Sequence, residues 1–192
     1  MPENILVRGV NWIGDAVMTM PSLKALRKAF PDARISLLVK PSVAAIFEKD
    51  PNIDEIIIYE NRHRGFLGRL KFAYSLRRRG FTKAVLLQNA FDAALIAFLA
   101  GIPERIGYDR DGRGFLLTKP IPFNDDDRKV HHIDYYLNIL AAAGILKDSP
   151  CSNPPGPSLL KVGEGGFLPW IYLSVDERLS ASEKLSQLKR PI

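Results

Sequence analysis

Residues 8–21 read RGVNWIGDAVMTMP and lie between a short apolar run at 5–7 and a segment at 22–30 in which Leu23, Leu26 and Phe30 recur at helical spacing. This order predicts a buried strand, a glycine-containing turn and then a helix. In an open α/β sheet, ligands bind beyond the carboxyl ends of the strands, where such turns lie. We therefore expect the functional site at this turn.

The turn carries one amide, one indole and one carboxylate, on Asn11, Trp12 and Asp15, beside Gly14, which lets a ligand approach the backbone closely. Two interpretations of Asp15 remain open. As an N-cap, the commoner use of Asp at a helix start, it accepts hydrogen bonds from free backbone N–H groups. As a general base, it takes a proton while the helix dipole keeps it ionised. The glycines form neither a dinucleotide-binding nor a P-loop pattern.

A second polar turn follows the apolar run at 84–87, where Gln88 and Asn89 precede an apolar helix at 93–100. Because this is again a strand followed by a helix, these two amides are the next candidates for the site. The alternative is that they serve only the turn, since Asn is a common turn residue.

The chain alternates short apolar runs with helical patterns, which predicts β-α-β units and a parallel sheet with right-handed crossovers. In the helix at 67–79 we expect Leu70, Tyr74 and Leu76 to face inward, and we expect residues 115–117 to be extended. The predicted strands are 5–7, 34–39, 56–59, 84–87, 106–108 and 170–174. The further predicted helices are 41–47, 131–143 and 175–188.

The length of 192 residues suffices for one domain with a core and an appendage. No apolar run approaches the roughly 20 residues that span a bilayer. The single cysteine, Cys151, excludes an intramolecular disulfide and fits a reducing compartment. No Cys/His spacing indicates a zinc site, so we expect no metal.

The net charge of +6 is concentrated in one segment. Residues 61–91 contain no Asp or Glu, which predicts an anionic partner or, equally for the run at 77–79, a solvated helix face. Arg62 and Arg64 lie on a glycine-containing loop and are the better ligand candidates. A nucleic-acid-binding α/β domain is the alternative, but interleaved aromatics and a nucleic-acid motif are missing. The eight basic residues of the segment are Arg62, Arg64, Arg69, Lys71, Arg77, Arg78, Arg79 and Lys83.

Five stretches of the sequence match the pattern of one known family. They are residues 12–15 with Met18, 21–23 and Leu26; residues 75–77 with Phe81; residues 87–91 with 94–95; the run FLAGIPERIGY at 98–108; and residues 131–136. On these stretches, which cover nearly the whole chain, the sequence resembles the bacterial lipopolysaccharide heptosyltransferases of glycosyltransferase family 9. The run at 98–108 is the most specific of them.

The resemblance implies a two-domain GT-B fold with the active site between two Rossmann-like halves. Residues 1–174 would form the N-terminal, acceptor-binding domain, a Rossmann-like parallel sheet with helices on both faces. Residues 175–192 would be a connecting helix and the start of a C-terminal domain that binds the donor. We therefore expect a truncated enzyme that is inactive alone and holds no donor-binding or cofactor-binding residue.

The implied reaction adds the second heptose of the inner core, from ADP-L-glycero-D-manno-heptose to heptosyl-Kdo2-lipid A, with inversion and without a metal or cofactor. Asp15 matches the family's proposed base. The expected acceptor contacts are Asn11, Trp12, Gly14, Arg62, Arg64, Gln88 and Asn89. The expected location is peripheral, at the cytoplasmic face of the inner membrane, and the oligomeric state stays open. A transferase for another core acceptor is the alternative.

Overall fold

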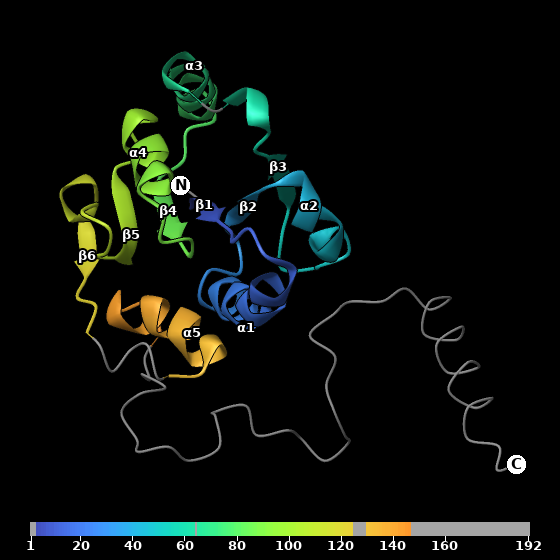
Figure 1. Ribbon diagram of the computed structural model, residues 1–192. Helices are drawn as coiled ribbons and strands as arrows, with labels where there is room; N and C mark the ends of the chain where they lie inside the picture. The colour runs from blue at the N-terminus through green and yellow to red at the C-terminus, as the bar shows by residue number, and fades with distance from the viewer. Residues whose placement is uncertain (1–2, 64, 125–129, 147–192) are drawn as a thin grey trace, which may run out of the picture.

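The computed structural model describes residues 3–63, 65–124 and 130–146 (Figure 1). The predicted strand at 170–174, the predicted helix at 175–188 and the proposed division after residue 174 lie outside the described residues.

The described residues contain one sheet of six parallel strands in the order β3-β2-β1-β4-β5-β6. The chain adds strands outward from β1 to β3 on one side and from β4 to β6 on the other, so its direction reverses between β1 and β4. This is the doubly wound α/β arrangement. The strands are β1 (Asn4–Arg8), β2 (Arg34–Val39), β3 (Glu55–Ile58), β4 (Lys83–Leu86), β5 (Glu104–Tyr108) and β6 (Lys119–Ile121).

Helices cover both faces of the sheet, as predicted, and each face has its own apolar cluster. One face packs on α1 (Ile13–Ala29), on α2 (Pro41–Ala44) with the 3-10 turn η1 (Ala45–Phe47), and on α5 (His132–Ala142). The other packs on α3 (Phe66–Arg77) and α4 (Phe91–Leu99). In Figure 1, α1 and α5 lie on the opposite side of the sheet from α3 and α4. Two further 3-10 turns are η2 (Asn61–His63) and η3 (Gly114–Leu116).

The helix after β1 starts earlier than predicted. It begins at Ile13, so the turn shortens to a few residues and Gly14 and Asp15 belong to the helix's first turn. The buried residues Ala16, Met20 and Leu23 share the face that continues to Leu26, with spacings of four and three residues. That periodicity is visible in the sequence and favours a helix from Ala16 onward.

Two other predictions were wrong. In α3, Leu70 and Tyr74 are 44% and 65% exposed, and the inward residues are Phe72, Ala73 and Leu76. Residues 115–117 are not extended but belong largely to η3, and the strand β6 follows them. The Lys-Pro-Ile sequence of β6 gave no strand signal, and its proline is tolerated because β6 is an edge strand.

Candidate functional site

The structure brings the two polar turns to the same edge of the sheet. The register places Arg8 beside Leu86 at the carboxyl ends of β1 and β4, and the backbone N–H of Gln88 donates to the carbonyl of Arg8 over 3.3 Å. Because the strand order reverses between β1 and β4, this is the crevice in which open α/β sheets bind ligands. The turns that carry Asn11 and Gln88 thus lie side by side.

Asp15 lies in the first turn of α1 but does not cap it. The N-cap is Trp12, whose side chain makes no capping hydrogen bond, so the N-cap expectation for Asp15 was wrong. Asp15 Oδ1 lies 3.4 Å from Nδ1 of His132, the first residue of α5, and the carboxylate is 34% exposed. The pKa of Tyr136 is raised far above its usual range, mainly by burial and also by the negative charge of nearby Asp15. The carboxylate is therefore reachable from solvent and held at the positive end of a helix.

Two buried amide oxygens at this edge have no partner among the described residues. They are Oδ1 of Asn11 and Oε1 of Gln88. Buried polar atoms of proteins are nearly always hydrogen-bonded, so an oxygen without a partner is unusual. Each of these oxygens can accept a hydrogen bond from a bound hydroxyl. Nearby, Trp12 is 77% exposed, and a Cβ added at Gly14 would meet nothing within 4 Å. The turn therefore presents open space to a ligand.

Asn89, by contrast, already uses both ends of its amide. Its Nδ2 donates to the hydroxyl of Tyr135 over 2.6 Å, and its Oδ1 accepts from Nη2 of Arg113 over 3.1 Å. These bonds tie the loop after β4 to α5 and to the loop after β5. Of the two predicted amides, Gln88 is therefore the one that is available to a ligand.

Arg113 was not predicted, although it organises the second turn. It is fully buried, and its guanidinium also donates to the carbonyls of Tyr108 over 3.0 Å, of Ala90 over 3.4 Å and of Gln88. Burial lowers its pKa to about 10, so it stays charged at neutral pH. The only sequence signal is a single arginine between two glycines, which is indistinguishable from a surface loop.

A second buried arginine lies at the end of β1. Arg8 is 3% exposed, donates from Nη1 to the carbonyl of Leu38 over 2.9 Å and lies over the ring of Tyr59. The Tyr59 hydroxyl donates to Asp92, which also forms an ion pair with Arg69. Burial lowers the pKa of Arg8 to about 10, while Tyr59 and Asp92 act in the opposite direction. A permanent positive charge therefore underlies the crevice.

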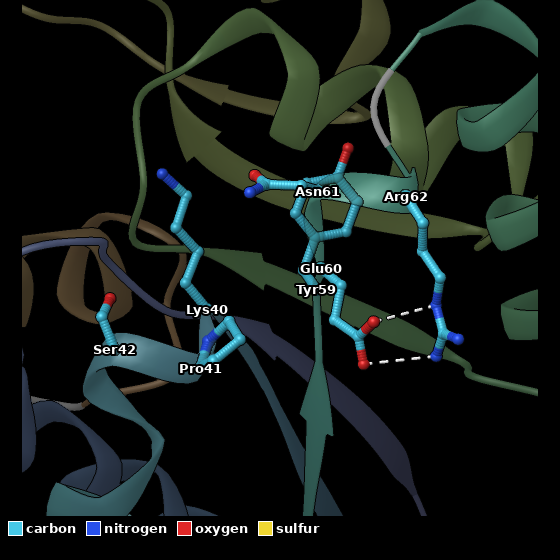
Figure 2. Close-up of a pocket in the computed structure, with 7 residues that line it drawn as sticks. All are labelled: Lys40, Pro41, Ser42, Tyr59, Glu60, Asn61 and Arg62. Carbon is cyan, nitrogen blue, oxygen red and sulfur yellow. Dashed lines mark hydrogen bonds and ion pairs between the residues drawn. The ribbon is translucent and has the colours of Figure 1, made fainter.

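A wide hollow of about 490 Å³ lies beyond the carboxyl ends of β2 and β3 (Figure 2). The cation of Lys40 and the amide of Asn61 border it, and so does Arg62, which forms an ion pair with Glu60 over 2.9 Å. Figure 2 shows the Glu60 and Arg62 side chains turned toward each other. The full lining is Lys40, Pro41, Ser42, Tyr59, Glu60, Asn61 and Arg62. Arg64, the other predicted arginine, lies outside the described residues.

Ion pairs neutralise part of the positive charge of the basic segment at 61–91. Half of its eight basic residues form ion pairs with acids that lie outside the segment. Among the described residues of the segment, Lys71, Arg77 and Arg78 form none. The segment is therefore not a continuous cationic surface. The pairs are Arg62 with Glu60, Arg69 with Asp92, Arg79 with Glu55 and Lys83 with Glu104.

Two features are absent from the described residues. No helix there is long and apolar enough to cross a membrane. No three His, Cys, Asp or Glu side chains there gather into a group that could hold a metal ion.

The profile of the family described as "Glycosyltransferase family 9 (heptosyltransferase)" matches residues 69–158. The chain is also 30% identical over 166 residues to the lipopolysaccharide heptosyltransferase 2 of Escherichia coli K12, a match that covers 84% of this chain and 47% of that protein. The chain belongs to glycosyltransferase family 9. The lipopolysaccharide heptosyltransferase 2 of Salmonella typhimurium is 29% identical over the same shares.

The solved structures confirm the predicted fold class. The structure of the E. coli ADP-heptose lps heptosyltransferase II superposes with a TM-score of 0.69 and 24% identity, over 95% of this chain and 50% of that one. A glycosyltransferase family 9 structure from Veillonella parvula gives a TM-score of 0.68 at 22% identity. The family 9 chain therefore has the fold of one Rossmann-like half of a GT-B glycosyltransferase, and it spans about half the length of the curated relatives that it matches.

Proposed function

We propose that the protein acts in lipopolysaccharide synthesis as a heptosyltransferase, and that the described residues form its acceptor-binding half. The proposed reaction transfers the second heptose from ADP-L-glycero-D-manno-heptose to heptosyl-Kdo2-lipid A. The observation that carries the proposal is the solvent-accessible carboxylate of Asp15, at the topological switch point of the sheet and beside two unpartnered amide oxygens. The names of the family 9 relatives support the choice of substrates.

Asp15 is the proposed general base. Its carboxylate takes the proton from an acceptor hydroxyl while that oxygen bonds to the anomeric carbon of the donor. The bond from that carbon to ADP breaks on the opposite face, ADP leaves with the bonding electrons, and the configuration inverts. The positive end of α1 favours the charged carboxylate before the transfer. The proposal requires neither a metal ion nor a cofactor.

Asn11 and Gln88 are proposed to orient the acceptor sugar. Each presents a buried amide oxygen that has no partner within the described part of the chain, and a sugar hydroxyl that donates to it would remove the cost of leaving it unpaired. Trp12 offers an exposed ring and Gly14 an open backbone for the sugar's apolar face. Asn89 is proposed to act by fixing the turn, because its own amide is already bonded on both sides.

The anionic groups of the acceptor are proposed to bind beside this crevice. Kdo carries a carboxylate and lipid A carries phosphates, and the hollow beyond β2 and β3 is bordered by Lys40 and Arg62. Arginine binds both groups through two parallel hydrogen bonds. Arg64, two positions after Arg62 in the sequence, is proposed for the same role. The acceptor is a lipid, so the proposed place of action is the cytoplasmic face of the inner membrane.

Calorimetric titration of the 192-residue chain with two ligands tests the proposal. We expect heptosyl-Kdo2-lipid A to bind and ADP-heptose not to bind. Binding of the donor alone would show that the assigned half is wrong. An acceptor that lacks the first heptose, titrated in parallel, should bind more weakly; equal binding would favour another core position.

Activity requires both halves of the cleft, so it is tested on a chimera. The described domain replaces the matching residues of the E. coli relative, whose remaining half supplies the donor site. We expect the chimera to transfer heptose and the 192-residue chain alone to transfer none. Turnover by the chain alone would contradict the assignment of the donor site to the other half.

A further inference from the structure

The helix α3 presents a row of large apolar side chains to solvent. Phe66 is 78% exposed, Leu67 is 68%, Leu70 is 44% and Tyr74 is 65%. With 3.6 residues per turn, they follow one another along one side of the helix. The core-facing side is formed instead by Phe72, Ala73 and Leu76. An apolar row of this kind on a soluble domain marks an interaction surface.

Basic side chains flank the row. Lys71, Arg77 and Arg78 are exposed and form no ion pair among the described residues, and no acidic residue occurs between positions 61 and 91. On the inner side, Arg69 is paired with Asp92 of α4, so its charge fixes α3 to the domain. The outer face of α3 therefore combines exposed aromatic and aliphatic groups with uncompensated positive charge.

We propose that this face of α3 docks on a bilayer that contains anionic lipids. Amphipathic helices with an apolar side and Lys/Arg beside it lie in the membrane interface, with the apolar groups in the acyl boundary and the cations among the headgroups. Lys and Arg stems reach outward from such a helix to the phosphates. The positive charge disfavours a second copy as the occupant, because two such faces repel each other.

The position of α3 connects this surface to the proposed acceptor site. Asn61 and Arg62 of η2 border the hollow beyond β3 and immediately precede α3 in the chain. Docking through α3 therefore holds the hollow at the membrane surface, where a lipid-anchored acceptor lies. This consequence depends on the proposed function, but the docking itself does not, and it is tested on lipid alone.

The experiment is co-sedimentation of the 192-residue chain with vesicles of phosphatidylcholine and with vesicles of phosphatidylcholine mixed with phosphatidylglycerol. We expect binding to the anionic vesicles and much less to the neutral ones. The variant F66S/L70S/Y74S should bind the anionic vesicles on the order of tenfold more weakly or worse, since each change removes a large apolar contact. F115S is the matched control, because Phe115 is 75% exposed but lies in η3, and it should bind like the original chain.

A charge variant keeps the test valid should the triple variant fold poorly. K71Q/R78Q should lower affinity for the anionic vesicles roughly 25-fold, at about fivefold for each basic group near the surface, while K28Q, on α1 across the sheet, should change it little. Absence of binding by the original chain, or equal binding by either α3 variant, would overturn the proposal. So would an α3-dependent dimer with unchanged lipid binding. Failure of any of these leaves the transferase proposal standing, because that proposal is tested with the acceptor and the donor.

Discussion

Replacement of the buried Arg113 by methionine tests whether this side chain holds the second turn of the site. Its guanidinium donates to four oxygens, the carbonyls of Gln88, Ala90 and Tyr108 and the amide oxygen of Asn89. Methionine fills a similar volume without donating to any of them. The guanidinium packs against the backbone of Gly107 in β5. A Cβ at position 107 would lie 3.2 Å from Nη2 of Arg113, so a side chain there would crowd the guanidinium.

The expected loss follows from the hydrogen bonds. Each of the four hydrogen bonds contributes about 1 kcal/mol to the free energy of unfolding, so Arg113→Met should lower that free energy by about 4 kcal/mol. Removal of the buried positive charge returns part of its desolvation penalty, so the loss should fall between about 2 and 4 kcal/mol. Arg113→Lys keeps the charge but not the planar fork, and it should cost nearly as much. A domain with a typical stability of about 5–15 kcal/mol would still fold.

Urea unfolding followed by circular dichroism measures the change in the free energy of unfolding. Lys28→Met, an exposed substitution on α1, is the matched control and should lie within about 0.5 kcal/mol of the original chain. In the titration with acceptor, Arg113→Met should also weaken binding, because the loop that carries Gln88 loses its support. An Arg113→Met protein within about 1 kcal/mol of the original chain, with unchanged acceptor affinity, would refute the reasoning.

Three further substitutions, at Asp15, Gly14 and Asp54, have expected outcomes in turnover, binding or stability. In the active chimera, Asp15→Asn should lower turnover by about 10²–10⁴-fold with unfolding unchanged, and near-normal turnover would exclude a base at this position. Gly14→Ala should raise the free energy of unfolding by about 0.5–1 kcal/mol, since the added methyl meets open space, yet weaken acceptor binding; unchanged affinity would contradict a ligand approach there. Burial opposes the ionisation of Asp54, but hydrogen bonds from a backbone N–H and from Arg27 outweigh it and lower the pKa. The stability from Asp54 is therefore complete above about pH 4 and lost as the pH falls through the lower folded pKa, and Asp54→Asn should remove that part of a pH titration of stability.

The sheet was predictable because its determinants are local. Mainly apolar runs of three to six residues alternate with helical patterns, and buried parallel strands have that composition. The short edge strand β6 was missed because its three residues contain a lysine and a proline. The helix α1 was predicted too short because residues 8–21 were assigned to a glycine-containing turn, whereas in the structure the helix begins at Ile13 and contains Pro21, which is buried. Tertiary burial of the surrounding face overrides the local cost of that residue.

The candidate site was predictable only where it follows strand ends. The sequence could point to Asn11 and Gln88 as candidates because the residues after β1 and β4 meet at the carboxyl ends of neighbouring parallel strands. The contact of Asp15 with His132 and the bonds of Arg113 to Gln88, Asn89 and Ala90 were not predicted, because they join segments that are more than 20 residues apart and no local pattern encodes them. Likewise, the spacing of Leu70 and Tyr74 is helical, but spacing alone does not determine which side of a helix meets the core.

The two edges of the sheet use polar groups in opposite ways. At the amino ends of the strands, Lys83 lies opposite Glu104 in the β4–β5 register and is paired with it, and Glu55 of β3 accepts from both Arg34 and Arg79. The acids that neutralise much of the basic segment are thus supplied by neighbouring strands, which a count along the chain does not detect. At the carboxyl ends, the amide oxygens of Asn11 and Gln88 have no partner among the described residues, and the buried Arg8 remains charged. Ion pairs thus lie at the amino ends of the strands, and the unpartnered amide oxygens at the carboxyl ends are the groups that the proposed acceptor would satisfy.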